Sequence, residues 1–289
     1  AKMKIISRAW KYLWRRVDKL IIRWVWLAIT AARFSVPALK KVQRERSWTV
    51  VSLTSIPERI GFVWVTLESL LRQTERAHTI VLVLSKQDFP TQRLPRSVNK
   101  RLSDDLSILW QEENIGSYKK SLPVFASYPN HPVLTVDDDA VYNKKMLADF
   151  SRIAGQNPGS IVGSRGLEVP LANSERGLPE YTSWPRASSK TRGNVLLTGH
   201  GGIFYPAGVL DETPVQDYGS AAKLCPNQDD IWLWAMALIA QAGRVVTPAA
   251  YYRRLPWATG PRALYRSNRE RTGNDLAIRR VIEHFHLEL

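Results

Sequence analysis

Three consecutive carboxylates follow a short apolar segment near the middle of the chain. Residues 133–136 predict a buried strand, and Asp137, Asp138 and Asp139 come directly after it. Adjacent like charges are unfavourable unless a cation lies among them, and carboxylate oxygens suit the hard ions Mg²⁺ and Mn²⁺. Such ions commonly bridge carboxylates to substrate phosphates. The pattern therefore predicts a divalent-metal and phosphate site, with a solvated acidic turn as the alternative.

A second acidic pair, Asp229 and Asp230, opens the apolar segment 229–242, which has the composition and length of a buried helix. One acid in a first helical turn often only compensates the helix dipole, for about 0.3–1 kcal/mol. Two adjacent acids at a cleft can instead supply a general base or orient an attacking hydroxyl. Asp230 and Asp229 are therefore candidate catalytic residues, with dipole compensation as the alternative.

Two further loops could contact a ligand, one through lysines that suit a phosphate and the other through a glycine-rich backbone. Lys119 and Lys120 follow the Gly116 turn just before a helix-like stretch, and a lysine at a helix start suits a diphosphate as well as it suits solvent. His200 lies among Gly199, Gly201 and Gly202, whose lack of a Cβ lets a backbone approach a ligand closely. Neither loop matches the dinucleotide-binding or P-loop glycine patterns, which weakens a dehydrogenase or P-loop kinase assignment.

The predicted elements alternate along the chain in a way that would bring these loops together. Strands are expected at 48–53, 78–84, 106–110, 133–136 and 245–247, and helices at 62–73, 118–127, 229–242 and 275–285. Alternating strands and helices predict an α/β fold with a mostly parallel sheet flanked by helices, which binds ligands at the carboxyl ends of its strands. In the irregular stretch 155–202 only 161–162 and 195–197 are strand-like, and such a stretch is typical of a functional loop or lid.

Composition bounds the class of protein. The chain has 289 residues, 44% of them hydrophobic, and a net charge of +15. Its single cysteine, Cys225, excludes an internal disulfide framework and a multi-cysteine zinc cluster, and fits a reducing compartment. Residues 1–46 contain thirteen Lys and Arg against two acids, so +11 of the charge lies there and +4 on residues 47–289. A nucleic-acid-binding domain would carry its basic residues across a folded face, so we expect no nucleic-acid partner.

The basic N-terminal segment has helical periodicity over residues 3–34, with Trp10, Trp14 and Trp24 on an apolar face and cations between them. This composition is typical of an amphipathic helix lying in an anionic membrane interface. The longest uncharged stretch, residues 24–32, is far shorter than the roughly 20 residues that span a bilayer. The alternative is that the helix packs on the body of the protein or on a second subunit.

Five motifs in order resemble a bacterial group of GT-A-fold glycosyltransferases of capsule and lipopolysaccharide assembly. They are SLTSIPERI (52–60), NIGSYKKSLP (114–123), VLTVDDDAVY (133–142), TGHGGIFYP (198–206) and QDDIWLWAMA (228–237). The DDD segment is similar to the DxD motif of nucleotide-sugar enzymes. The likeness covers roughly residues 48–285. It implies a GT-A-like glycosyltransferase domain over 47–289, preceded by the membrane-surface helix and linker of residues 1–46.

The resemblance also implies roles for the acids. Asp139 would ligate Mn²⁺ or Mg²⁺ directly, and Asp137 and Asp138 would support the metal or hold the ribose. Asp230 would face the reacting centre, as base in an inverting reaction or as a stabiliser of positive charge in a retaining one, and Asp229 would assist it. The sequence leaves the choice between these stereochemical outcomes open.

The remaining contacts to the nucleotide sugar are assigned to basic and loop residues. By the same resemblance Lys120 would face the diphosphate, and Thr54 and Arg59 would line the nucleotide. His200, in its glycine loop, is grouped with these contacts. A C-terminal histidine ligates the metal in some GT-A enzymes, so His284 or His286 is a candidate ligand, with an ordinary surface position as the alternative.

The resulting hypothesis is a metal-dependent glycosyltransferase of bacterial surface polysaccharide synthesis. It would move a sugar from a nucleotide-sugar donor, expected to be a UDP-sugar, to a glycan or lipid-linked acceptor. The enzyme would be cytoplasmic and peripheral on the inner face of the cell membrane, and oligomerisation is left open. One rival is a nucleotidyl- or phosphotransferase using the same acids. The other is a membrane- or nucleic-acid-binding adaptor with a vestigial site.

Overall fold

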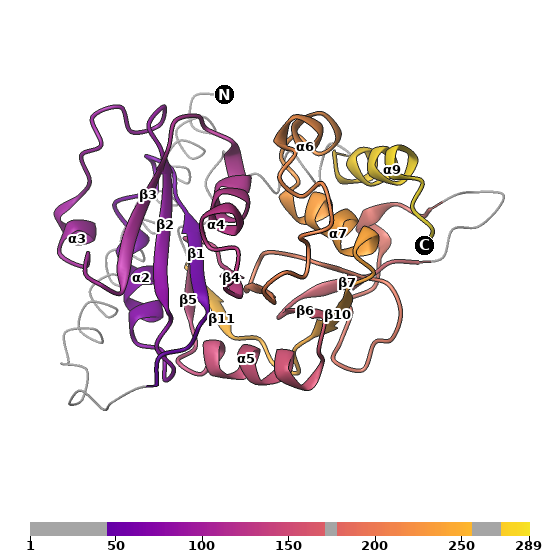
Figure 1. Ribbon diagram of the computed structural model, residues 1–289, viewed down its shortest axis with the longest axis horizontal. Helices are drawn as coiled ribbons and strands as arrows, with labels where there is room; N and C mark the ends of the chain where they lie inside the picture. The colour runs from indigo at the N-terminus through magenta and orange to yellow at the C-terminus, as the bar shows by residue number, and fades with distance from the viewer. Residues whose placement is uncertain (1–44, 171–177, 256–272) are drawn as a thin grey trace, which may run out of the picture.

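The computed structural model describes residues 45–170, 178–255 and 273–289. A seven-stranded sheet forms its centre (Figure 1). In spatial order its strands are β10 (Gly243–Val246), β6 (Ser160–Gly163), β9 (Ile203–Tyr205), β4 (Val133–Thr135), β1 (Val50–Thr54), β2 (Thr79–Ser85) and β3 (Leu106–Gln111). Every adjacent pair is parallel except the two that β9 makes with β4 and β6. The predicted mostly parallel sheet is therefore confirmed.

Two small antiparallel sheets lie beside the main one. The first pairs β5 (Ala140–Tyr142) with β11 (Tyr252–Arg254), and the second pairs β7 (Gly166–Glu168) with β8 (Val195–Leu197). Both β5 and β7 begin within a few residues of the carboxyl end of a central strand, β4 or β6. The small sheets therefore extend the edge at which the parallel strands end.

Helices cover both faces of the central sheet, as the alternating pattern requires. The α-helices are α2 (Val63–Leu71), α3 (Arg96–Asn99), α4 (Leu122–Ser127), α5 (Met146–Gln156), α6 (Tyr218–Leu224), α7 (Asp229–Ile239) and α9 (Gly273–Phe285), and the 3₁₀ helices are η1 (Gly116–Lys120) and η2 (Tyr181–Ser183). One core layer joins Leu67 of α2 and Phe150 of α5 to the sheet. The other includes Trp232 of α7 and Leu122 of α4.

Strand sequence explains this two-sided burial. In β2 every residue is buried, with Ile80 and Leu82 in one core cluster and Val81 and Val83 in another. A strand covered on both faces reads as a continuous apolar run, as this one does. β9 alternates in the same way, since Phe204 packs on one face while its two neighbours pack on the other.

Some local predictions differ from the structure. The helix expected over 118–127 is split into η1 and α4 at Ser121, because Pro123 lies in the first turn of α4 and has no N–H to continue the preceding helix. β9, β11 and α5 were not predicted. Within the irregular stretch 155–202, the strand-like segments 161–162 and 195–197 are confirmed as β6 and β8, while β7 and η2 were not predicted.

The basic segment 3–34 and its predicted helix lie outside the described residues. The described chain begins against the body, where Ser47 N donates to Arg76 O at 2.7 Å and Arg76 N donates to Glu45 O at 3.0 Å. Within the ranges given above, no helix is both long and apolar enough to cross a bilayer. The domain boundary at 46/47 stays a prediction.

Candidate active site

The acidic motif continues β4 beyond the edge of the sheet, and its three side chains have different surroundings. Asp138 is buried: Ser55 Oγ donates to its Oδ2 at 2.6 Å, and Arg59 Nη2 lies 3.0 Å from its Oδ1. Both partners come from the loop after β1, the strand next to β4 in the sheet. Asp138 therefore ties the two loops together, a structural contact that leaves its neighbours to face the site.

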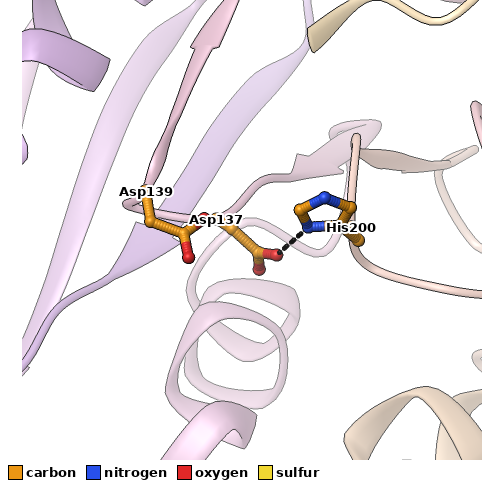
Figure 2. A group of neighbouring side chains, drawn as sticks. All are labelled: Asp137, Asp139 and His200. Atoms are coloured by element: carbon orange, nitrogen blue, oxygen red, sulfur yellow. Dashed lines mark ion pairs between the residues drawn. The ribbon is translucent and has the colours of Figure 1, made fainter. Parts of the chain in front are cut away.

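The outer two acids meet a histidine from a distant loop. One ligand atom each from Asp137, Asp139 and His200 lie within 4.8 Å of one another, and His200 Nδ1 is 3.5 Å from Asp137 Oδ2 (Figure 2). Oδ1 of Asp139 is buried and has no hydrogen-bond partner among the described residues. Two carboxylates and an imidazole form a donor set that suits a divalent cation. The residues present therefore fit a metal ion.

The electrostatics favour a cation at the same place. Burial, and then the neighbouring charge of Asp137, raise the pKa of Asp139, although Arg59 and Arg254 oppose the shift. Burial also raises the pKa of Asp138 to about 7 against the opposing effects of Arg59 and Ser55. Raised carboxyl pKa values mean that the ionised forms are insufficiently compensated by the protein alone. A bound cation would restore that balance.

Lys120 joins the two acidic groups that the sequence singled out. Its Nζ lies 3.0 Å from Asp137 Oδ1 and 3.3 Å from Asp229 Oδ2, and the residue is only 7% exposed. Burial alone would lower the pKa of Lys120, but Asp137, Asp229 and Asp230 hold it well above its usual value. The same ammonium overcomes burial and holds the pKa of Asp137 well below its usual range. Lys120 is thus a permanent buried cation rather than a solvated one.

The neighbouring residue, Lys119, contacts two loops of the protein rather than the acids of the site. It is 1% exposed, and its Nζ donates to Asp88 Oδ2 at 3.0 Å and to Asn114 Oδ1 at 2.7 Å. These contacts join the loop after β2 to the loop after β3. Lys119 therefore braces the turn that presents Lys120.

The acidic pair lies at the N-terminus of α7, as predicted. Gly199 N donates to Asp230 Oδ2 at 2.9 Å, and Oδ1 of the same carboxylate accepts no hydrogen bond from a described residue. Burial, followed by the charge of Asp229, raises the pKa of Asp230 to about 7 despite the nearby Lys120. A carboxylate with a pKa near neutrality and one unengaged oxygen is suited to accept a proton.

The glycine loop packs too tightly for side chains at two positions. A Cβ on Gly199 would lie 2.9 Å from both Asp230 Oδ1 and Lys120 Nζ. Gly201 has φ +105°, and a Cβ there would meet Ser164 Oγ and the Tyr252 ring. Glycine therefore lets this loop approach Asp230, Lys120 and Tyr252 closely.

The pairing of β4 with β9 explains why His200 meets the acidic motif. These strands are antiparallel, with Thr135 opposite Ile203. The residues that precede β9 therefore lie beside those that follow β4. His200 was expected among the nucleotide contacts, and because β9 was not predicted, the proximity of its imidazole to Asp137 was not expected either.

The two C-terminal histidines have a different setting. His284 and His286 are exposed at the end of α9, which packs on α6 and α7, and His284 contacts the Phe285 ring at 4.6 Å. The group of described side chains that could hold a metal ion consists of Asp137, Asp139 and His200 and includes neither of them. His200 is therefore a further candidate ligand, and ligation by His284 or His286 stays a prediction.

The two predicted nucleotide contacts at the end of β1, Thr54 and Arg59, differ in how far their side chains are already engaged within the protein. Thr54 Oγ1 donates to Val83 O at 2.7 Å, so its hydroxyl already joins β1 to β2. Arg59 is about one-third exposed, 34%, while paired with Asp138. Its position beside the acids agrees with a role at the site, and contact of either residue with a nucleotide stays a prediction.

Three aromatic and basic residues at the site were not among the predicted site residues. The Tyr142 hydroxyl accepts from Asp137 N at 2.9 Å and so fixes the start of the acidic turn. Arg254 Nη2 lies 3.8 Å from Asp139 Oδ2, and the Tyr252 ring contacts His200. Tyr252 and Arg254 belong to β11, and Tyr142 to its partner β5. An unpredicted strand pair thus carries all three.

No family model and no curated protein sequence matches the chain. Among solved structures, it is similar to the mannosyltransferase PcManGT from Pyrobaculum calidifontis in complex with GDP-Man and Mn²⁺, with 14% identity and a TM-score of 0.54 over 92% of this chain and 72% of that one. It also matches S. aureus TarS 1-349 in complex with UDP, with 16% identity and a TM-score of 0.47 over 83% and 72%. In the match to the longer S. aureus TarS structure, the aligned region covers 43% of the TarS chain. At such identities the likeness shows the fold alone, and the chain has the GT-A-like α/β fold that its motifs predict.

Proposed function

We propose that the protein is a metal-dependent glycosyltransferase that moves a sugar from a nucleotide-sugar donor to a hydroxyl group of its acceptor. One observation carries the proposal: buried Lys120 contacts both Asp137 of the metal-binding group and Asp229 beside the candidate base Asp230. The two acidic groups thus form one site at the carboxyl edge of a sheet, where α/β folds bind ligands. A departing diphosphate needs cations, and an attacking hydroxyl needs a base.

Asp137, Asp139 and His200 would hold Mn²⁺ or Mg²⁺. Such an ion supplies positive charge that stabilises a diphosphate leaving group. Lys120 would add a fixed ammonium on the same side, and since it is already oriented by Asp137 and Asp229, little reorganisation is required when the donor binds. Asp138, held by Ser55 and Arg59, would keep the acidic turn in place.

Asp230 would act on the acceptor side. Its Oδ2 is held by Gly199 N, which leaves Oδ1 to accept the proton of an attacking hydroxyl in an inverting reaction. In a retaining reaction the same carboxylate would stabilise positive charge at the sugar carbon. Asp229, paired with Lys120, would keep the ammonium oriented between the two groups.

The biological setting extends the proposal. We infer a UDP-sugar as the first donor to test, and a glycan or lipid-linked acceptor in bacterial surface polysaccharide synthesis, from the motif resemblance. The concentration of +11 in residues 1–46 supports a peripheral position on an anionic membrane surface. GDP-sugars belong in the same screen because the mannosyltransferase of similar fold was solved with GDP-Man.

The direct test is turnover of a panel of UDP- and GDP-sugars by the purified full chain with Mn²⁺. We expect free nucleoside diphosphate together with transferred or hydrolysed sugar, and a loss of at least about 100-fold in Asp139→Asn, since the metal ligand acts on the leaving group. Asp104→Asn, an exposed acid in the loop before β3, is the matched control and should retain activity.

Product identity separates this proposal from its enzymatic rival. Pyrophosphate or a phosphorylated product would assign a nucleotidyl- or phosphotransferase. Metal-independent turnover that survives both Asp139→Ala and Asp230→Ala would overturn the proposed site.

A further inference from the structure

Strand β11 crosses the end of the acidic motif and holds its backbone. In the antiparallel pair with β5, Arg254 lies opposite Ala140, and the next residue, Leu255, donates its N–H to Asp139 O at 2.9 Å. Arg254 Nη2 also lies 3.8 Å from the Asp139 carboxylate. One side of the candidate metal centre is therefore built directly on β11.

The same strand reaches the other side of the centre through Tyr252. The edge of one ring meets the face of the other in the Tyr252–His200 pair, with centroids 4.5 Å apart and an interplanar angle of 78°. The backbone of Gly201 is so close to this ring that a Cβ there would meet Cδ1 at 2.6 Å. Tyr252 therefore packs against both the imidazole and the loop that carries it.

The Tyr252 ring, rather than its hydroxyl, makes this contact. Among the described residues, no hydrogen bond involves the hydroxyl, whereas the ring packs at the distances just given. The imidazole itself contacts Asp137 through Nδ1 at 3.5 Å and Tyr252 through its ring. Ligand imidazoles are commonly oriented by a neighbour outside the coordination shell. Here an aromatic ring occupies that position.

We propose that Tyr252 is a positioning residue of the metal centre, which orients the His200 imidazole toward Asp137 and Asp139. The inference rests on the metal site of the proposed function but not on sugar transfer. It predicts that Mn²⁺ affinity depends on an aromatic ring at position 252, and that this dependence acts through His200.

Mn²⁺ affinity is measured by electron paramagnetic resonance of the free ion, titrated into the full chain after chelation. Tyr252→Leu is expected to weaken binding about tenfold, the lower end of the effect of losing an outer-shell partner. Tyr252→Phe, which keeps the ring, should bind within about twofold of the unmodified chain. In the His200→Ala background, Tyr252→Leu should cause no further loss, because interacting residues are non-additive.

Tyr251→Leu is the control for general loss of packing. The Tyr251 ring packs on the Phe150 ring in the core layer of α5, with the ring centroids 5.6 Å apart. The Tyr251→Leu substitution should therefore lower the Tm without changing the Mn²⁺ affinity per folded molecule. Unchanged affinity in Tyr252→Leu would overturn the positioning role, and so would an equal loss in Tyr252→Phe. If the unmodified chain binds no Mn²⁺, the metal site itself falls; if Mn²⁺ binds but no donor is consumed, only the transferase proposal fails.

Discussion

At the scale of single residues, the site depends on one buried cation surrounded by acids. Lys120 contacts Asp137 and Asp229 and lies near Asp230 and Gly199. A buried charge is costly unless it is paired, so removing Lys120 would leave several carboxylates uncompensated. This arrangement separates the roles of the acids: Asp137 stays ionised, while the pKa of Asp230 lies near 7.

The raised pKa of Asp230 predicts a pH profile. If Asp230 is the base, its active form is the ionised one, so kcat/KM for donor and acceptor should fall about tenfold per pH unit below about pH 7. The measurement is kcat/KM between pH 5.5 and 9 at saturating Mn²⁺. A flat profile over this range would exclude Asp230 as the essential base.

The raised pKa of Asp230 also predicts that a rise in pH lowers the free energy of unfolding, while it increases activity. Because the folded-state pKa of Asp230 is raised, its protonated form stabilises the fold at low pH, and this contribution is lost as the pH rises toward 7. Asp230→Asn keeps an acceptor for Gly199 N without the charge. The variant should therefore gain about 1–3 kcal/mol over the unmodified chain at pH 8, with a smaller gain at pH 5. Urea unfolding of the chelated protein at the two pH values measures this, and a variant less stable at pH 8 contradicts it.

At the scale of elements, the loop between β8 and β9 is the most constrained part of the site. Gly199→Ala would push a methyl group against Asp230 Oδ1 and Lys120 Nζ, both 2.9 Å from the Cβ position. We expect at least a tenfold loss of kcat, since small displacements of reacting groups are costly. Gly155→Ala in α5, whose Cβ would meet nothing within 4 Å, is the control. It should keep full activity and be more stable by about 0.5–1 kcal/mol.

The calorimetric Tm of each glycine variant shows whether a loss of turnover is caused by unfolding. Gly199→Ala should remain folded at the assay temperature while losing turnover. Equal kcat values for Gly199→Ala and Gly155→Ala would show that the loop does not position Asp230 and Lys120.

The elements that carry strong local patterns could be predicted from sequence. The apolar runs of β1, β2, β3 and β4 and the helix opened by Asp229 are local signals, and their alternation sufficed for the fold class. β9 and β11 are three residues long, and what defines them is their long-range pairing with β4 and β5. Strands this short leave little periodicity, so the contacts of His200 with Asp137 and Tyr252 had no local signal.

For the acids, too, the candidate site residues could be predicted from sequence, whereas their individual contacts could not. Asp137, Asp139 and Asp230 were identifiable because runs of carboxylates at a strand end or helix start are chemically unusual. Within the 137–139 run, Asp138 is held apart from its two neighbours by Ser55 and Arg59, which are more than 75 residues away in sequence.

At the scale of the whole molecule, charge is divided between a basic N-terminal segment and a mildly basic body. Residues 1–46 carry +11 and residues 47–289 carry +4. If the N-terminal segment attaches the protein to anionic lipid, the full chain should co-sediment with phosphatidylglycerol-containing vesicles, and binding should weaken with salt. Deleting residues 3–34 should abolish co-sedimentation while donor hydrolysis persists.

Neutral vesicles and a chain lacking residues 3–34 are the two controls. Retained binding of the truncated chain to anionic vesicles would place the membrane contact elsewhere. Loss of donor hydrolysis together with vesicle binding would instead show that the segment supports the fold or the active site.

If Asp137, Asp139 and His200 form one nucleotide-sugar donor site with the Lys120-linked acidic pair, a bound metal ion should strengthen nucleotide binding. Calorimetric titration of UDP and GDP into the full chain, with Mn²⁺ and with chelator, tests it most directly. We expect Mn²⁺ to lower the Kd of at least one nucleotide by about tenfold or more, an effect lost in Asp139→Asn and retained in Asp104→Asn. Equal nucleotide affinity with and without Mn²⁺, or full affinity in Asp139→Asn, would contradict it.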